Sequence, residues 1–211
     1  MPERYVPAAG RRFLTGLYDP AVAVTMRERT FRRMLVRQAA ARDPKTILDV
    51  GCGTGSQAIA LADAIPHAQI TAVDGDPDAL GRARTRAGGR PILWTEALAQ
   101  DLPLADNAVD SATASLLLHH LSPLTRLEAL REIRRVLRPG GRLHVADWGR
   151  PHDPAMQIVF LAIRALDGRE NTADHVAGRI PQIIRDAGFP NVHVTGRLRT
   201  ALGTLDIVEA S

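Results

Sequence analysis

Three glycines and two aspartates have the types and the spacing needed to bind a nucleoside ligand. Asp49 closes an apolar run and is followed within six residues by Gly51, Gly53 and Gly55. A turn without Cβ atoms that leads into a helix start lets a ligand approach unpaired backbone N–H groups. Asp74 ends the next apolar run, where a carboxylate can accept hydrogen bonds from ribose hydroxyls. The pattern predicts a nucleoside site; the alternative is a tight turn whose glycines serve geometry alone, followed by an ordinary Asp-Gly turn.

The residues after these glycines separate the possible nucleotide sites. A P-loop needs a Lys-Ser/Thr pair after its glycines, whereas this chain continues with Ser56 and Gln57. The dinucleotide motif G-x-G-x-x-G places its third glycine one residue later than Gly55. A P-loop is therefore excluded, and binding of a nicotinamide dinucleotide is disfavoured but stays open.

Two adjacent histidines follow the predicted fourth strand in the sequence LLLHHL. An imidazole can remove a proton from an acceptor near neutral pH, so His119 and His120 are candidate general bases. Adjacent residues in a helical turn cannot both face one pocket, and we place His120 ahead of His119. The alternative is that both rings are exposed or pack against the bound nucleoside.

Two aromatic residues are candidates to line a substrate pocket. Trp148 follows Asp147 at the end of the predicted fifth strand, and Tyr18 lies in the sequence LYDP. Trp148 is expected either to line the pocket or to pack under the following helix. Asp147 is expected to cap that helix or to face solvent, and Tyr18 is a candidate lid residue.

Short apolar runs that alternate with helical stretches must position these residues. This order is typical of a parallel sheet covered by helices. An amphipathic helical segment comes first, and a helix at 173–187 and two antiparallel strands separated by Gly203-Thr204 come last. Between them we expect strands at 46–50, 69–73, 91–94, 109–115 and 142–146, and helices at 55–65, 77–87, 123–137 and 154–166.

Proline pairs predict where two of these helices begin. Asp76 precedes Pro77, and Ser122 precedes Pro123, so each pair places a side-chain acceptor before a residue that suits the first helical position. The sequence RPGG at 138–141 is expected to end the second helix and turn the chain into the next strand.

Length and composition bound the class of protein. With 211 residues, 45% hydrophobic and 24% charged, the chain fits one ordinary folded domain. The basic residues that give the net charge of +4 are arginines except for Lys45, and they favour solvated helix faces over a nucleic-acid or membrane surface. The single Cys52 excludes a disulfide framework and a multi-cysteine zinc cage, so no metal is expected. We expect a cytoplasmic protein without a signal peptide or membrane span.

The chain resembles the class I S-adenosylmethionine-dependent methyltransferases. Over residues 44–148 the resemblance rests, in order, on LDVGCGTG, VDGD, LAQDLPLADNAVDSATASLLLHHL and LREIRRVLRPGGRLHVADW. Within the class it is similar to the ubiquinone and menaquinone C-methyltransferases. The resemblance implies an α/β fold with a Rossmann-like, seven-stranded, mostly parallel sheet, a C-terminal antiparallel strand pair, and helices on both faces.

The resemblance also implies S-adenosylmethionine as the cofactor. Asp49 would lie near its amino group, and Asp74 would hold its ribose hydroxyls. The glycines would pass beside its methionine and ribose parts. The implied cofactor-binding residues are Asp49, Gly51, Cys52, Gly53, Thr54, Gly55, Asp74, Gly75, Leu98, Ala99 and Ser115.

One position departs from the pattern of these relatives. Sequences of the form GDAEDLPF carry an acidic residue for the adenine amino group where this chain has Leu98. We therefore expect backbone groups at Leu98 and Ala99 to bind the adenine edge, with Glu96 or Gln100 in place of the missing carboxylate.

The methyl acceptor is expected to be a small, apolar molecule. The single domain would comprise an N-terminal helical cap, the cofactor core, substrate-side helices and C-terminal strands, at 1–43, 44–148, 149–187 and 188–211. The stretch PAMQIVFLAIRAL is apolar enough to contact such an acceptor, although this pattern more often forms helix core. The fourth strand ends in SLLL rather than the Asn/Asp-Pro-Pro-Tyr/Phe clamp of nucleic-acid enzymes. An RNA or DNA methyltransferase, a non-catalytic cofactor-binding module and an NAD-dependent oxidoreductase are the alternatives.

Overall fold

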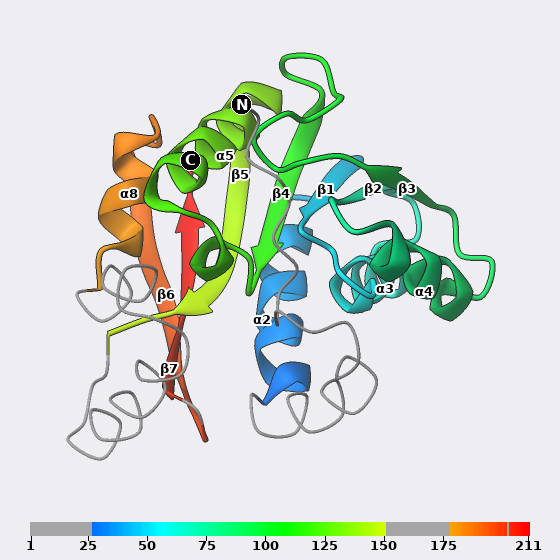
Figure 1. The fold of residues 1–211 in the computed structure, drawn as a ribbon, viewed down its shortest axis with the longest axis horizontal. Coiled ribbons are helices and arrows are strands. Elements are labelled where there is room, and N and C mark those ends of the chain that lie inside the picture. The colour runs from blue at the N-terminus through cyan, green and yellow to red at the C-terminus, as the bar shows by residue number, and fades with distance from the viewer. Residues whose placement is uncertain (1–26, 151–177, 202) are drawn as a thin grey trace.

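The chain forms one seven-stranded sheet, shown with its helices in Figure 1. The computed structural model describes residues 27–150, 178–201 and 203–211. The strands are β1 (Thr46–Val50), β2 (Gln69–Asp74), β3 (Ile92–Glu96), β4 (Val109–Ser115), β5 (Leu137–Trp148), β6 (Val192–Thr200) and β7 (Gly203–Ala210). Their order is β3-β2-β1-β4-β5-β7-β6. The pairs among β1 to β5 are parallel, and β7 is antiparallel to both β5 and β6. The expected fold class is confirmed.

Helices cover both faces of this sheet. They are α2 (Glu28–Ala40), α3 (Ser56–Ala64), α4 (Pro77–Ala87), α5 (Pro123–Val136) and α8 (Ile180–Asp186), with a 3₁₀ turn, η1, at Leu118–His120. Helix α3 connects β1 to β2, and α4 connects β2 to β3, so the chain moves toward one side of the sheet. Helix α5 connects β4 to β5 and moves the chain toward the other side. Connections between parallel strands are right-handed. The two groups of helices therefore lie on opposite faces; α2 contacts α3, and α5 contacts α8.

Both expected helix starts are present. Asp76 accepts hydrogen bonds from the N–H groups of Asp78 and Ala79 at 2.9 and 3.3 Å, and the helix begins at Pro77. Ser122 accepts the N–H of Thr125 at 3.2 Å. These caps satisfy N–H groups that have no partner within the helix.

The RPGG sequence does not form the expected turn between α5 and the next strand. Helix α5 ends at Val136, and β5 begins at once with Leu137, which pairs with Val109. Pairing then resumes with Arg142 opposite Ser111, so 138–141 forms an irregularity inside β5. The strand is longer than the expected 142–146 because its pairing with β4 already begins at Leu137, before the two glycines.

The C-terminal hairpin also turns earlier than expected. Thr200 pairs with Gly203, and Arg199 pairs with Thr204, so both Gly203 and Thr204 belong to β7 rather than to the connection. The helix expected at 154–166 lies outside the described residues, as does the first part of the helix expected at 173–187.

The sheet topology predicts where a ligand binds. The strand order reverses between β1 and β4, and ligands of open α/β sheets bind outside the carboxyl ends of the strands at such a point. The glycine loop follows the carboxyl end of β1 and therefore lies at this edge. In the part of the chain that the structure describes, no helix has the length and apolar character needed to cross a bilayer.

Candidate active site

The glycine loop connects β1 to α3. Gly53 has a φ of +54°, and a Cβ there would meet no atom within 4 Å, so the loop is open at this residue. A Cβ at Gly55 would lie 2.6 Å from the Trp94 ring, and one at Gly51 would lie 2.6 Å from Leu117. Of the three glycines, Gly53 is the one that opens the backbone to a ligand, while the other two permit close packing.

Protein contacts brace the rest of this loop. The N–H of Cys52 donates to the carbonyl of Val73 at 3.0 Å, and burial raises the pKa of the Cys52 thiol. Arg86 of α4 donates to the carbonyl and the hydroxyl of Thr54 at 2.9 and 2.6 Å. The sequence analysis did not identify Arg86, because its contact with the loop spans 32 residues.

Asp49 is a fully buried carboxylate at the end of β1. Its Oδ1 accepts a hydrogen bond of 2.7 Å from the Thr113 hydroxyl, whereas Oδ2 has no partner of good geometry in the described part of the chain. Burial raises the pKa of Asp49 to about 6, opposed chiefly by the Thr113 hydroxyl, then by the charge of Arg32 and the N–H of Ala58. A buried carboxylate oxygen without a donor is unfavourable, so this site suits a cationic donor on a ligand.

Asp74 lies at the same edge, at the end of β2. Its Oδ2 accepts the N–H of Gly53 at 2.7 Å, and its Oδ1 accepts the N–H of Asp76 at 2.9 Å. Burial raises the pKa of Asp74, and these backbone N–H groups limit the rise. The side chain thus links the glycine loop to the β2–α4 turn, which includes Gly75, and each oxygen keeps a lone pair for a ligand hydroxyl.

Helix α2 brings a guanidinium to this edge. Phe31 and Leu35 are buried, and they hold the helix against the sheet. Between them, Arg32 donates from Nη1 to the Ser115 hydroxyl at 3.3 Å and from Nε to Glu28 at 2.6 Å. No sequence pattern distinguishes Arg32 from the many other arginines, because its contact with Ser115 joins residues 83 positions apart.

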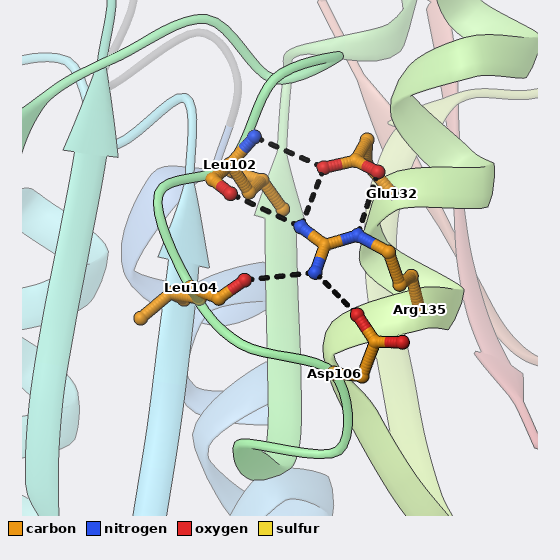
Figure 2. A network of polar contacts seen from close by, with 5 residues as sticks. All are labelled: Leu102, Leu104, Asp106, Glu132 and Arg135. Carbon is orange, nitrogen blue, oxygen red and sulfur yellow. Dashed lines mark hydrogen bonds and ion pairs between the residues drawn. The ribbon is translucent and has the colours of Figure 1, made fainter.

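The loop between β3 and β4 is anchored to α5 by the network in Figure 2. Arg135 donates to the carbonyls of Leu102 and Leu104 at 3.1 and 2.8 Å and forms ion pairs with Glu132 and Asp106. Glu132 also accepts the N–H of Leu102 at 3.1 Å. The network therefore fixes the loop that contains the expected adenine-binding residues.

Those residues lie just beyond the end of β3. Leu98 is 37% exposed, Ala99 is half-buried, and the exposed Glu96 pairs in register with Asp74. The N–H of Ala97 donates to the Asp74 carbonyl at 3.1 Å. Glu96 is thus beside the expected ribose site, and the roles of Glu96 and Gln100 toward adenine stay predictions.

The histidine segment after β4 is held by two buried charged side chains. Asp147 at the end of β5 accepts the N–H of Leu118 at 2.8 Å through Oδ2. Arg126 of α5 is fully buried and donates to the carbonyls of Leu118 and Leu121 at 2.8 and 2.9 Å. The solvent-facing alternative for Asp147 is wrong, because the side chain is 1% exposed. The helix-capping alternative stays a prediction, because the following helix is expected outside the described residues.

The two histidines lie in different environments. His119 Nδ1 is 2.8 Å from Asp147 Oδ1, and its ring meets Trp148 edge-on with centroids 6.2 Å apart. His120 is exposed, with its ring centroid 3.9 Å from that of His119. His119 therefore contacts a carboxylate that can orient its ring, and the order of the two histidines as candidate bases stays a prediction. Trp148 is half-buried beside His119, and Tyr18 lies outside the described residues.

The arrangement at this edge fits S-adenosylmethionine. The unpartnered Asp49 Oδ2 suits its ammonium group, Asp74 suits the ribose hydroxyls, and the open backbone at Gly53 leaves room between them. Arg32 lies where it would suit the methionine carboxylate. The side-chain amide of Gln57 at the start of α3 is also buried, with neither end hydrogen-bonded within the described residues.

Comparisons with known proteins identify the family of the chain. Residues 47–141 match a family model described as a methyltransferase domain. The ubiquinone/menaquinone biosynthesis C-methyltransferase UbiE of Desulfotalea psychrophila is 30% identical, over 92% of this chain and 85% of the relative. The demethylmenaquinone methyltransferase of Thermus thermophilus is 35% identical, over 62% of this chain and 59% of its own length.

A solved structure shares the fold. The magnesium protoporphyrin IX methyltransferase ChlM of Synechocystis with bound SAH superposes with a TM-score of 0.67 and 20% identity, over 87% of this chain and 82% of that one. At this identity the likeness supports the fold, whereas the sequence relatives support the family. The chain therefore belongs to the class I S-adenosylmethionine-dependent methyltransferases.

Proposed function

We propose that the chain transfers a methyl group from S-adenosylmethionine to a small, apolar acceptor of the quinol class, in which a ring hydroxyl or ring carbon must lose a proton. The names of the relatives support this class, since one is named for ubiquinone and menaquinone biosynthesis and the other for demethylmenaquinone. The family membership supports methyl transfer. The proposal goes beyond family membership because it names the class of acceptor and the residues that act on it.

In this proposal the chain's own residues hold and orient the cofactor. Asp49 accepts from the ammonium group, Asp74 accepts from the ribose hydroxyls, and Gly53 gives the backbone its close approach. A charged hydrogen bond of this kind contributes roughly 1.5–3 kcal/mol. When bound, the cofactor supplies an electrophilic methyl group on a sulfonium, and the remaining task of the protein is to align an acceptor atom with it.

His119 is the general base of the proposed reaction. An ionised carboxylate only accepts hydrogen bonds, so the contact with Asp147 requires the proton on His119 Nδ1 and places the lone pair of the ring on Nε2. Asp147 then stabilises the imidazolium that forms when Nε2 takes a proton. The contact between Gly51 and Leu117 places the start of this segment beside the glycine loop. Trp148 offers an apolar ring beside His119 for the acceptor.

The 2.8 Å contact between His119 Nδ1 and Asp147 Oδ1 carries this assignment, and substitution of each histidine tests it. Methyl transfer to a demethylated naphthoquinol would be measured with labelled donor for His119→Gln and for the matched variant His120→Gln. We expect kcat to fall about 10²- to 10⁴-fold in His119→Gln, with the affinity for S-adenosylhomocysteine unchanged. His120→Gln should stay within a few-fold of the wild type. Equal losses in both variants, or full activity of His119→Gln, would contradict the role of His119.

A nucleic-acid acceptor is the second candidate, because helix α5 carries the exposed Arg131 and the partly exposed Arg134. It predicts salt-dependent binding and labelling of RNA in the same assay. We expect labelled product in the lipid-soluble fraction only. A cytoplasmic location is part of the proposal, supported by a lone cysteine whose thiol is buried and unbridged.

A further inference from the structure

A polar pocket lies at the opposite edge of the sheet from the glycine loop. It is formed where α2 ends and β1, β4 and β5 begin, and its volume is about 380 Å³. Its lining residues are Gln38, Ala39, Arg42, Asp43, Pro44, Lys45, Asp110, Ser111, Arg138, Pro139, Gly140, Gly141, Arg142 and His144. The methyl-transfer site uses none of these side chains.

Four side chains of this pocket carry buried polar atoms with no hydrogen-bond partner in the described part of the chain. They are Gln38 Oε1, the Ser111 hydroxyl, Arg142 Nε and His144 Nδ1. Ser111 is 3% exposed and His144 is 1% exposed, so bulk water does not reach most of either side chain. Buried polar groups are normally paired, and four unpaired groups around one pocket indicate a polar occupant with both donors and acceptors, such as a protonated phosphate.

The charge of the pocket indicates the sign of that occupant. Four cationic side chains line it, against two carboxylates. Asp110 pairs with Arg138, and Asp43 is directed at His67, with 3.0 Å between Asp43 Oδ1 and His67 Nε2. Arg142 pairs with Glu209 outside the lining. Arg42 and Lys45 thus bring two further positive charges, of which Asp43 offsets one, so the lining keeps a net positive charge.

Two of the cations lie close enough to repel each other. Burial, and then the charge of Arg42, lower the pKa of Arg142. Burial and the charge of Arg142 lower the pKa of His144 to about 4, so this imidazole is neutral at pH 7, and the 3.8 Å between it and Glu209 is not an ion pair. An anion between the two guanidiniums would relieve their repulsion. The carboxyl end of α2 carries a partial charge of about −0.5, and its repulsion of the anion is weaker than the attraction of two full positive charges.

We propose that this pocket binds a phosphate group, held by the guanidiniums of Arg42 and Arg142 and by the hydroxyl of Ser111. Guanidinium pairs bind the oxygens of phosphate in a fork geometry, and the hydroxyl and the neutral imidazole each add one donor. The group is either inorganic phosphate or the phosphate of a small monoester. This site is independent of the proposed methyl transfer, since it lies at the other edge of the sheet.

Titration with inorganic phosphate and with glycerol 3-phosphate, against chloride at equal ionic strength, tests the site. With a Kd of roughly 1 mM, 10 mM ligand should raise the Tm of the wild type by about 3–6 °C. Phosphate also stabilises proteins by exclusion from their surface, so the comparison of variants is decisive. Arg42 is exposed, and Arg42→Gln should fold and bind S-adenosylhomocysteine as the wild type does, with at least tenfold weaker phosphate binding.

The matched control is Arg82→Gln, which removes the same charge from α4, away from the pocket. It should keep the full phosphate response, and Ser111→Ala should weaken binding several-fold. The ligand that gives the larger Tm shift, inorganic phosphate or glycerol 3-phosphate, shows whether the site prefers free phosphate or a monoester. Equal Tm shifts in the wild type and Arg42→Gln, no difference from chloride, or binding only of single-stranded RNA would overturn the proposal.

Discussion

Asp49 is the residue at which stability and binding conflict most directly. Its carboxylate is fully buried, and one oxygen has no partner of good geometry among the described residues. The native state without ligand therefore favours the protonated form, and the pKa rises to about 6. A ligand ammonium would reverse this preference, because it offers both charge and donors to Oδ2. The same residue should weaken the empty protein and strengthen the complex.

This conflict predicts the effect of Asp49→Asn on the ligand-free protein. Because the folded pKa lies above the unfolded value, the proton stabilises the native state below pH 4, and this contribution is lost as the pH rises through about 6. At pH 7.5, Asp49→Asn should be more stable than the wild type by about 1–3 kcal/mol in urea unfolding. The difference should vanish near pH 4.

Asp63→Asn is the matched control for this comparison. Asp63 is exposed, and its hydrogen bonds with Arg90 lower its pKa, so its substitution should not stabilise the protein at pH 7.5. Destabilisation by Asp49→Asn at pH 7.5 would show that the carboxylate is already well paired without a ligand.

Sequence reasoning located the residues whose positions depend on neighbours in the chain, while their roles toward the cofactor stay predictions. Asp49 and Asp74 lie at the ends of β1 and β2, Gly53 follows β1, and the structure brings them together at one edge. It did not identify Arg32, or the contact of Asp147 with His119, because each is defined by a partner far along the chain. The choice between two adjacent histidines depended on the direction of a 3₁₀ turn that Asp147 and Arg126 fix from other elements.

At the scale of elements, side chains from α5 hold both loops that border the site. Arg126 fixes the histidine segment, and Arg135 fixes the loop between β3 and β4. These contacts explain why a polar helix face must sit against the carboxyl edge of the sheet. The helix itself, like α4, was predictable from its proline start and its apolar period, and β4 from its apolar run. The early start of β5 required the pairing of Leu137 with Val109.

Loss of the Arg135 network should weaken cofactor binding while the protein keeps its fold. Arg135→Met leaves the carbonyls of Leu102 and Leu104 and the carboxylate of Glu132 without this donor. We expect destabilisation of about 1–2 kcal/mol, since the guanidinium is partly exposed and its bonds are screened. Affinity for S-adenosylhomocysteine should fall several-fold, as the loop expected to bind adenine becomes less ordered.

Arg131→Met controls for this experiment, because it removes an exposed arginine of the same helix that is outside the network. It should leave both stability and affinity unchanged. If Arg135→Met bound S-adenosylhomocysteine as tightly as Arg131→Met, the loop would not depend on this anchor.

At the scale of the whole molecule, one sheet separates two polar regions of opposite character. The carboxyl edge carries the buried Asp49 and the half-buried Asp74, and the amino edge gathers cationic side chains around His144. The alternation of strands and helices in the sequence predicted the sheet and its carboxyl-edge site. It could not predict the pocket at the other edge, which is formed by segments far apart in the chain.

These two regions predict opposite pH dependences that largely cancel in the wild type. His144 has a folded pKa of about 4, below its unfolded value, so its contribution to stability is present above pH 6.5 and is lost as the pH falls toward 4. Asp49 acts in the opposite direction over nearly the same range. In urea unfolding from pH 7 to 4, His144→Phe should gain stability, Asp49→Asn should lose it, and the wild type should change less than either. Parallel curves for all three proteins would contradict these assignments.

The most direct test of the account is calorimetric titration of the wild type and Asp49→Asn with S-adenosylhomocysteine between pH 5 and 7.5. The wild type should bind one equivalent, with an affinity that falls up to about tenfold per pH unit below 6, because the Asp49 carboxylate must lose its proton to accept the ligand ammonium. Asp49→Asn should bind at least tenfold more weakly at pH 7.5, with little dependence on pH. Absence of binding by the wild type, or equal and pH-independent affinity in the two proteins, would contradict the assignment of this edge as the cofactor site.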